Sequence, residues 1–128
     1  MDSEHFISYA KDRSVELSLT SDLDLNVSAP KGFLTQEIVI FLKNYKDPVV
    51  DQLCKYEFQN EIFRIIFPDD IGFVVSRVRY VSGRKRLEIV RSYLKEFDVG
   101  YKAEPNPVKK RNAGRQRANA WIREEKFY

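Results

Sequence analysis

Apolar residues alternate with polar ones over residues 15–27, and this alternation constrains the fold more than any other feature of the sequence. The apolar members of the two alternating runs are Val15, Leu17, Leu19, Leu23, Leu25 and Val27. A period of two places such side chains on one face of a strand. We therefore expect an antiparallel hairpin that turns at residues 20–22, with an acidic outer row on its second strand. The preceding residues 3–10 fit either a short helix or an edge strand.

A breaker at residues 30–32 separates the hairpin from a stretch with helical spacing. The apolar residues of this stretch are Leu34, Ile38, Phe41, Leu42 and Tyr45. Thr35 is positioned to cap the helix, which should end before Pro48. Asp47 followed by Pro48 is typical of a new helix start. The apolar residues of this second helix are Val49, Val50, Leu53, Cys54 and Tyr56. The sequence predicts two helices in tandem with a corner at Asp47.

The second half of the chain opens with two apolar runs around a cluster of turn residues. Residues 62–67 are apolar except for Arg64, residues 68–72 are rich in turn formers, and residues 73–80 form the second run. This pattern predicts a second hairpin. Ser82 can then cap a last regular helix, which Gly100 would end. The expected buried stripe of that helix is Leu87, Val90, Leu94 and Phe97, and its expected water-facing residues are Arg84, Glu88, Arg91 and Lys95.

The order of these elements predicts an α+β fold. Two hairpins would form a mainly antiparallel sheet covered on one face by helices, in the order ββααββα. The 128 residues would divide into a single globular domain over residues 1–102 and a basic C-terminal extension over residues 103–128. Residues 104–107 contain two prolines and are typical of a linker. We expect the extension to be mobile without a partner and partly helical near residues 113–126.

Cysteine content and hydropathy predict the compartment. Cys54 is the single cysteine, so no disulfide can form within the chain, and the chain lacks an apolar run of about 18 residues that could cross a membrane. The N-terminal residues show neither a basic region nor an apolar core typical of a signal peptide. We expect a cytoplasmic or nuclear protein in a reducing compartment, without a membrane partner.

Charge is segregated along the chain. Residues 1–76 carry 7 basic and 13 acidic side chains, a net charge of −6, whereas residues 77–128 carry 15 basic and 6 acidic side chains, a net charge of +9. A solvated surface needs only mixed charge. Segregation of this kind favours a polyanionic partner, of which nucleic acid is the commonest, or an acidic surface on another protein.

Two basic clusters are candidate nucleic-acid contacts. The first consists of Arg77, Arg79, Arg84, Lys85 and Arg86. In a strand, Arg77 and Arg79 would project to the same side about 7 Å apart, close to the phosphate spacing of one nucleic-acid strand. The helix start at Ser82 adds backbone amides that can bind a phosphate. Alternatively, the two strand arginines pair across the sheet with Glu16, Asp22 or Asp24.

The second cluster lies in the C-terminal extension and consists of Lys109, Lys110, Arg111, Arg115 and Arg117. No acidic residue lies between Pro105 and Ile122. Such a segment can order along a phosphate backbone or serve as a nuclear import signal.

Aromatic residues accompany the basic half. Trp121, Phe127 and Tyr128 are candidate anchors for a partner, although Trp121 can also pack on its own domain or stack on a base. Tyr80 and Tyr101 are candidates for base stacking. The chain contains neither a ribonucleoprotein-type aromatic motif nor a GxxG loop.

The residues offer little for catalysis, so we expect no enzyme, no cofactor and no metal. His5 is the only histidine, which leaves triads and histidine-based zinc sites without support. Glu61, Asp69 and Asp70 form the best carboxylate group for a metal-dependent nuclease, yet residues 68–72 are first of all a turn. Phosphate-binding loops of the Walker or dinucleotide type are absent.

Two hypotheses follow. The first is a non-enzymatic accessory protein that binds RNA or DNA through its basic strand and helix face and its basic C-terminal tail. The second is an interaction or self-assembly module whose tail docks on an acidic partner or on a second copy. Removing residues 105–128 would abolish self-association under the second and leave weak nucleic-acid binding under the first. The length and charge fit a small viral or phage accessory protein, a ribosome-associated factor or a nucleoprotein subunit.

Overall fold

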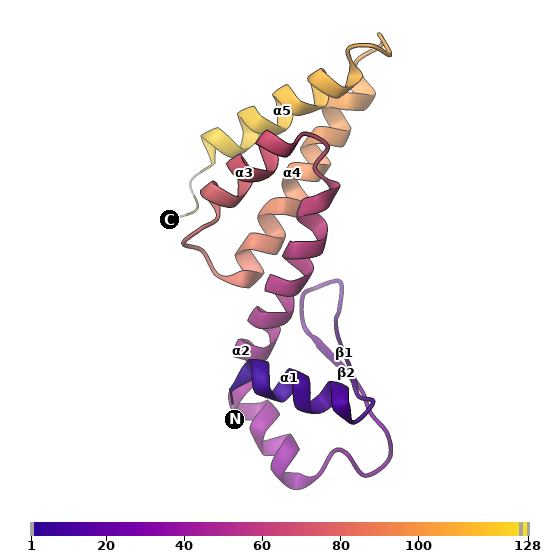
Figure 1. The fold of residues 1–128 in the computed structure, drawn as a ribbon, viewed down its shortest axis with the longest axis vertical. Coiled ribbons are helices and arrows are strands. Elements are labelled where there is room, and N and C mark those ends of the chain that lie inside the picture. Colours follow the sequence, from indigo (N-terminus) through magenta and orange to yellow (C-terminus); the bar gives the residue numbers. More distant parts are fainter. Residues whose placement is uncertain (1, 126, 128) are drawn as a thin grey trace. The chain divides into compact units, whose positions relative to one another are not determined.

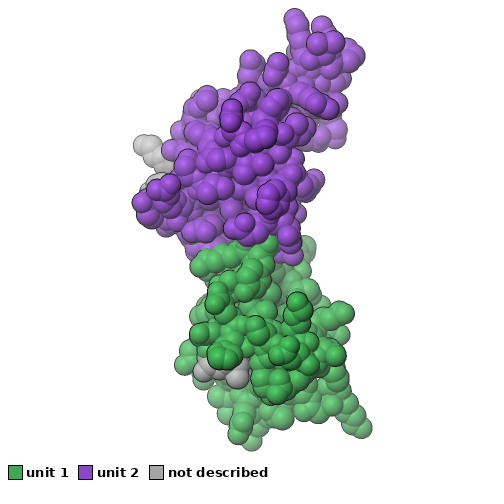
Figure 2. All heavy atoms as spheres, in the orientation of Figure 1, with its two compact units in different colours: residues 1–56 green, residues 57–128 purple. Residues whose placement is uncertain are grey.

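The computed structural model describes residues 2–125 and 127, and these residues are mostly helical (Figure 1). Five α-helices, one 3-10 helix and one antiparallel strand pair occur among them, in the order α-β-β-α-α-α-α. The predicted α+β fold with two hairpins is therefore wrong. The chain divides into two compact units, residues 1–56 and 57–128 (Figure 2), whereas the sequence placed its boundary after residue 102.

The first unit begins with a helix and the predicted hairpin. Helix α1 (Ser3–Asp12) settles the alternatives left open for residues 3–10, and its first turn is capped by Asp2, whose Oδ1 accepts from the backbone N–H of His5 at 2.7 Å. Strands β1 (Glu16–Leu19) and β2 (Leu25–Ser28) pair antiparallel, with Leu17 opposite Val27. The hairpin prediction is confirmed.

Helix α2 (Gln36–Glu61) contains a kink at Tyr45, where φ is −124° and ψ is 17°. Pro48 lies three residues further on. Its ring crowds the carbonyl four residues earlier and its nitrogen cannot donate, so the helix bends just before it. The predicted pair of tandem helices is therefore present, with its corner at Tyr45 instead of Asp47. Thr35 caps the start, since its Oγ1 accepts from the backbone N–H of Ile38 at 3.3 Å.

The core of the first unit is small and apolar. The rings of Phe6 in α1 and Phe41 in α2 stack with centroids 4.8 Å apart. Cys54 is fully buried, as expected for a small apolar side chain on the inner face of α2. The other buried apolar residues are Ala10, Val15, Leu23, Val49 and Val50.

The second unit replaces the predicted second hairpin by helices. A 3-10 helix η1 (Ile62–Arg64) is followed by helix α3 (Pro68–Arg77). Pro68 occupies the first turn, where its missing N–H is harmless, and Asp69 and Asp70 lie at the positive end of the helix dipole. Val74 and Val78, four residues apart, are both buried, which is helical spacing. A proline and two aspartates that suggest a turn therefore begin a helix.

Helices α4 (Gly83–Ala103) and α5 (Lys110–Glu124) lie side by side (Figure 1). Ser82 caps α4 as predicted, but Gly100 does not end it. A Cβ built on Gly100 would lie 2.7 Å from the carbonyl oxygen of Ala113, and one on Gly114 would lie 2.7 Å from that of Phe97. The two glycines therefore allow the backbones to approach closely, and α5 belongs to the folded unit.

Residues from all parts of the second unit share one apolar core. Its buried apolar residues are Phe58, Ile62, Ile65, Val74, Val78, Leu87, Ile89, Val90, Tyr93, Ala118 and Ile122. Leu87 and Val90 are buried as predicted, and Leu94 and Phe97 are half-buried. Among the residues that the structure describes, no helix has the length and apolar character needed to cross a membrane.

Candidate nucleic-acid interface

Arg77 lies at the end of α3, so the predicted strand geometry of Arg77 and Arg79 is wrong. Its Nη2 donates to the carbonyl oxygens of Ile122 at 2.9 Å and Glu125 at 3.0 Å. Ile122 lies in the last turn of α5 and Glu125 is the C-cap residue that follows the helix, where carbonyls lack partners within the helix. Arg77 therefore holds the C-terminal end of α5 against α3.

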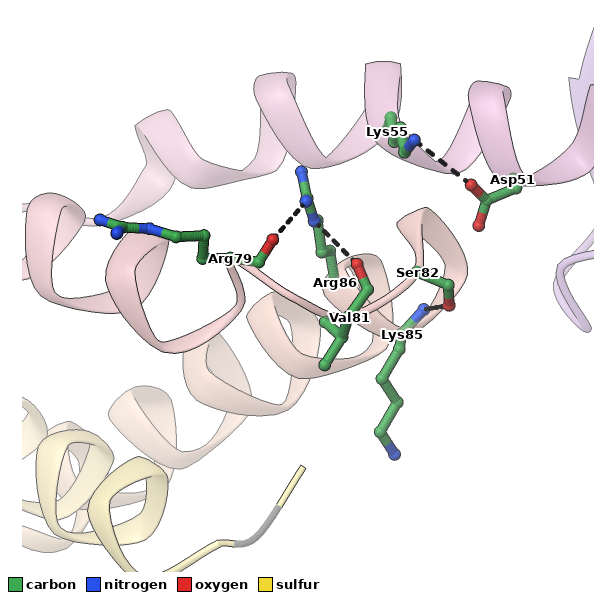
Figure 3. A network of polar contacts seen from close by, with 7 residues as sticks. All are labelled: Asp51, Lys55, Arg79, Val81, Ser82, Lys85 and Arg86. Carbon is green, nitrogen blue, oxygen red and sulfur yellow. Dashed lines mark hydrogen bonds and ion pairs between the residues drawn. The ribbon is translucent and has the colours of Figure 1, made fainter. Parts of the chain in front are cut away.

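The loop between α3 and α4 is organised by Arg86 (Figure 3). Its Nε donates to the carbonyl oxygen of Val81 at 3.2 Å, and its Nη2 donates to that of Arg79 at 2.9 Å. Ser82 accepts from the backbone N–H of Lys85 at 3.2 Å. Arg86 is thus a structural residue of this corner.

Three other cations of the first cluster lie at the same corner. Arg79 and Lys85 are exposed, and the guanidinium of Arg79 lies 6.0 Å from the ring centre of Tyr80. Arg84 forms an ion pair with Glu88, one turn along α4, at 3.5 Å. Of the acids offered as alternative partners, Asp24 pairs with Lys46 in the first unit at 2.7 Å. The corner therefore presents Arg79 and Lys85 to solvent.

The second basic cluster lies on α5 and in the turn before it. The Nζ of Lys110 donates to the carbonyl oxygens of Tyr101, at 3.3 Å, and Glu104, which lie at the end of α4. Arg117 forms an ion pair with Glu96 of α4 at 2.7 Å. Both side chains fasten α5 to α4, whereas Lys109 and Arg111 are exposed.

A buried polar network joins α3, α4 and α5. Arg115 Nε lies 2.8 Å from Asp70 Oδ2, and Asp70 Oδ1 accepts from Asn119 at 3.3 Å. Asn119 Oδ1 in turn accepts from the hydroxyl of Tyr93 at 2.7 Å. Burial, together with the negative charge of Asp70, raises the pKa of Tyr93 to about 12, while Arg115 and Arg123 act in the opposite direction. The network fixes the Arg115 guanidinium in place.

Polar side chains line a groove of about 440 Å³ along α5. Its lining residues are Asn112, Arg115, Gln116, Asn119 and Arg123. Amide and guanidinium groups of this kind donate hydrogen bonds to phosphates and to base edges. Sequence reasoning named only Arg115 among them. The other four recur every three or four residues, which places them on one face of a helix. A predicted helix beginning at Lys110 would have shown that they lie together.

No family model, curated protein or solved structure matches this chain. The interpretation of the site therefore depends on its residues alone. The second unit, residues 57–128, carries 16 basic and 10 acidic side chains, a net charge of +6, and the first unit carries 6 and 9, a net charge of −3.

Two of the three predicted partner anchors, Trp121 and Phe127, pack within the second unit. Trp121 and Phe127 are both half-buried, and their ring centres lie 6.2 Å apart. Arg77 lies 5.9 Å from the ring centre of Phe127. Tyr128 lies outside the described residues. Of the alternatives considered for Trp121, the structure shows the one in which its ring packs on its own unit.

The carboxylates considered for a nuclease do not gather. Asp70 is buried against Arg115, Asp69 is exposed at the start of α3, and Glu61 forms an ion pair with Arg64 at 2.9 Å. Within the described part of the chain, no group of three histidine, cysteine, aspartate or glutamate side chains is placed to hold a metal ion.

Proposed function

We propose that the second unit binds nucleic acid, RNA or DNA, through its exposed cations, without catalysing a reaction. The observation that supports the proposal is a set of exposed cations on α5 and on the turn before it. Lys109, Arg111 and Arg123 are exposed there, beside the amides that line the groove. Glu124, at the end of α5, is the only acidic residue of that helix. A row of cations and amides with no acid before Glu124 suits a phosphate backbone.

The ten basic residues of the two clusters then divide by role. The cations that can reach phosphates are the exposed Arg79 and Lys85 at the α3–α4 corner and Lys109 and Arg111 near the start of α5, to which we add Arg123. Arg77, Arg86 and Lys110 instead donate to backbone carbonyls. The roles of Arg84, Arg115 and Arg117, which form ion pairs, are secondary, because a phosphate would compete with their carboxylates.

Salt dependence of binding tests the proposal. We expect the variant Lys109→Gln/Arg111→Gln/Arg123→Gln to bind a labelled oligonucleotide more weakly than the unmodified chain. Three lost phosphate contacts would reduce the slope of log affinity against log salt by about 3 for duplex and about 2 for single strands. Fluorescence anisotropy between low and moderate salt measures this slope.

A matched control removes three exposed lysines from the acidic first unit, Lys11→Gln/Lys31→Gln/Lys43→Gln. Both variants lose three charges, so net charge alone affects them equally. We expect the control to keep the slope of the unmodified chain. A slope near zero for the unmodified chain, or equal slopes for the two variants, contradicts the proposal.

The cellular setting that we propose is a reducing one, the cytoplasm or the nucleus. Cys54 is a buried thiol and the single cysteine of the chain, so it cannot form a disulfide within the chain. Labelling Cys54 with a thiol reagent in the native chain should be slow and should become fast only in denaturant.

A further inference from the structure

We infer that the nucleic acid bound by the second unit is single-stranded, and that a groove between η1 and α4 receives one of its bases. The inference rests on the proposed nucleic-acid function and names the substrate class. It depends on the surface formed by Phe63 and the neighbouring groove, which lies outside the two basic clusters. That surface joins an exposed aromatic ring to cations.

Phe63, in the 3-10 helix η1, has 75% of its surface exposed. Its neighbours Ile62 and Ile65 are buried in the core, which fixes the short helix and turns Phe63 outward. An exposed phenylalanine loses the free energy that burial would provide. Its ring therefore lies at the surface, where a base can stack on it.

A groove of about 620 Å³ adjoins η1. Its lining includes the apolar side chains of Ile66, Leu94 and Phe97 and the cations Arg64, Arg91 and Lys95. Its apolar lining comes from three side chains, including Phe97, and this surface can receive the face of an unstacked base. Arg64, next to Phe63 in the chain, also lines it. The exposed ring of Phe63 and the groove-lining Arg64 therefore belong to consecutive residues of η1.

The charges of this groove favour an anion. Its two acids form ion pairs with basic neighbours, Glu61 with Arg64 at 2.9 Å and Asp98 with Lys102 at 2.8 Å. Two further cations of the lining, Arg91 and Lys95, are exposed and stand one turn apart on α4. Phosphates that flank an inserted base can therefore be bound at the same groove.

A second exposed ring in this unit repeats the combination. Tyr80 has 78% of its surface exposed, and the guanidinium of Arg79 lies 6.0 Å from its ring centre. In a duplex the base faces are stacked on one another and cannot reach such rings. In a single strand every base has a face to offer. Rings beside cations therefore favour single strands over duplex, whereas cations alone would serve both.

The experiment compares one labelled 12-nucleotide sequence as single-stranded DNA, as single-stranded RNA and as a blunt DNA duplex, using the full chain and fluorescence anisotropy. We expect the single strands to bind at least fivefold more tightly than the duplex. Phe63→Ala should weaken single-strand binding by about fivefold or more, the lower limit for one stacked base, and leave duplex binding unchanged. Phe63→Tyr, which keeps a ring, should restore it.

Val108→Ala is the matched control, since Val108 is an exposed apolar residue of the same unit, with 88% of its surface accessible. It should bind like the unmodified chain. Arg91→Gln/Lys95→Gln should reduce the salt slope for single strands by about 1.4. Circular dichroism checks that each variant is folded. We expect all of them to fold, because the replaced side chains are exposed and do not contribute to the core.

The outcomes separate the inference from the proposed function. Equal or tighter binding of the duplex overturns the inference and leaves nucleic-acid binding intact. The same holds if single strands are preferred but Phe63→Ala binds like Val108→Ala. If neither form binds, the proposed function fails and the inference fails with it. A preference for RNA over DNA, or the reverse, among the single strands leaves the inference supported and identifies the natural strand.

Discussion

The hydroxyl of Tyr93 lies at one end of the buried network that joins α3, α4 and α5. Removing it measures how much this end of the network contributes to the free energy of unfolding. The hydroxyl donates to Asn119 Oδ1 at 2.7 Å, and Asn119 donates to Asp70 in α3. Tyr93→Phe removes only this hydroxyl and leaves a buried acceptor without its donor. The loss should reduce the free energy of unfolding by about 1–3 kcal/mol at neutral pH.

The same hydroxyl makes stability depend on pH in the alkaline range. The pKa of Tyr93 is raised to about 12 in the folded chain, from an ordinary value of 10.0. Below pH 10 the group is protonated in the folded and the unfolded chain, so its contribution is fully present. Between pH 10 and 12 only the unfolded chain releases the proton, so stability is lost as the pH rises. Two pH units correspond to about 3 kcal/mol.

Urea unfolding followed by circular dichroism at pH 9, 10, 11 and 12 tests this reasoning. The stability difference between the unmodified chain and Tyr93→Phe should shrink by up to about 3 kcal/mol across the series, because the variant lacks the titrating group. Comparison of the two chains cancels the titration of the other tyrosines and lysines. A difference for Tyr93→Phe that is the same at pH 9 and pH 12 refutes the argument.

Two further predictions concern the packing of α5. Gly114→Ala should destabilise the chain by about 1–3 kcal/mol, because the new Cβ would lie 2.7 Å from the backbone oxygen of Phe97. Gly72→Ala, in α3 with open space around it, should instead raise the free energy of unfolding by up to about 1 kcal/mol. Equal thermal stabilities of the two variants would contradict this reasoning. Arg77→Met should lower the melting temperature and speed amide hydrogen exchange in the last turn of α5, because it removes the donor to Ile122; unchanged exchange there would show that the contact does not hold the helix end.

Local signals in the sequence predicted the elements whose partners are close in the chain. The alternation around Leu17 and Val27 was sufficient for the first hairpin, because the two strands are joined by a short turn. Thr35 and Ser82 were recognised as caps because a cap acts on an N–H three residues away. Pro48 indicated the break in α2 to within a few residues, since its effect reaches only to the preceding turn.

The second hairpin was predicted wrongly because the signals of residues 62–80 are ambiguous. Pro68 followed by two aspartates suits both a turn and the first turn of a helix. Valine is common in strands, yet Val74 and Val78 also share one helical face. Tertiary contacts decide between these readings: Asp70 pairs with Arg115, which lies 45 positions further along the chain. Such a partner leaves no local mark in the sequence.

The C-terminal segment was interpreted as an appendage because its composition is polar. Its apolar surface is too small for a helix to fold alone, as the sequence indicated. Gly114, Ala118 and Ile122 repeat every four residues, however, and this narrow stripe is enough against a neighbour that also has a glycine at the crossing. Removing residues 105–128 would therefore take away α5 and part of the core. The truncation cannot separate self-association from nucleic-acid binding, and gel filtration of the full chain with and without an oligonucleotide is the informative test.

The cations that hold the helices together also bear on how the proposed function must be tested. Arg86 and Lys110 donate to carbonyl oxygens, which carry no net charge, so their positive charges still contribute to the field around the second unit. Replacing them would weaken nucleic-acid binding and the fold together, and a loss of affinity would then have two explanations. Lys109 and Arg111 are exposed, so their replacement changes the field without loosening a helix end. Only variants of this second kind can attribute a loss of binding to lost phosphate contacts.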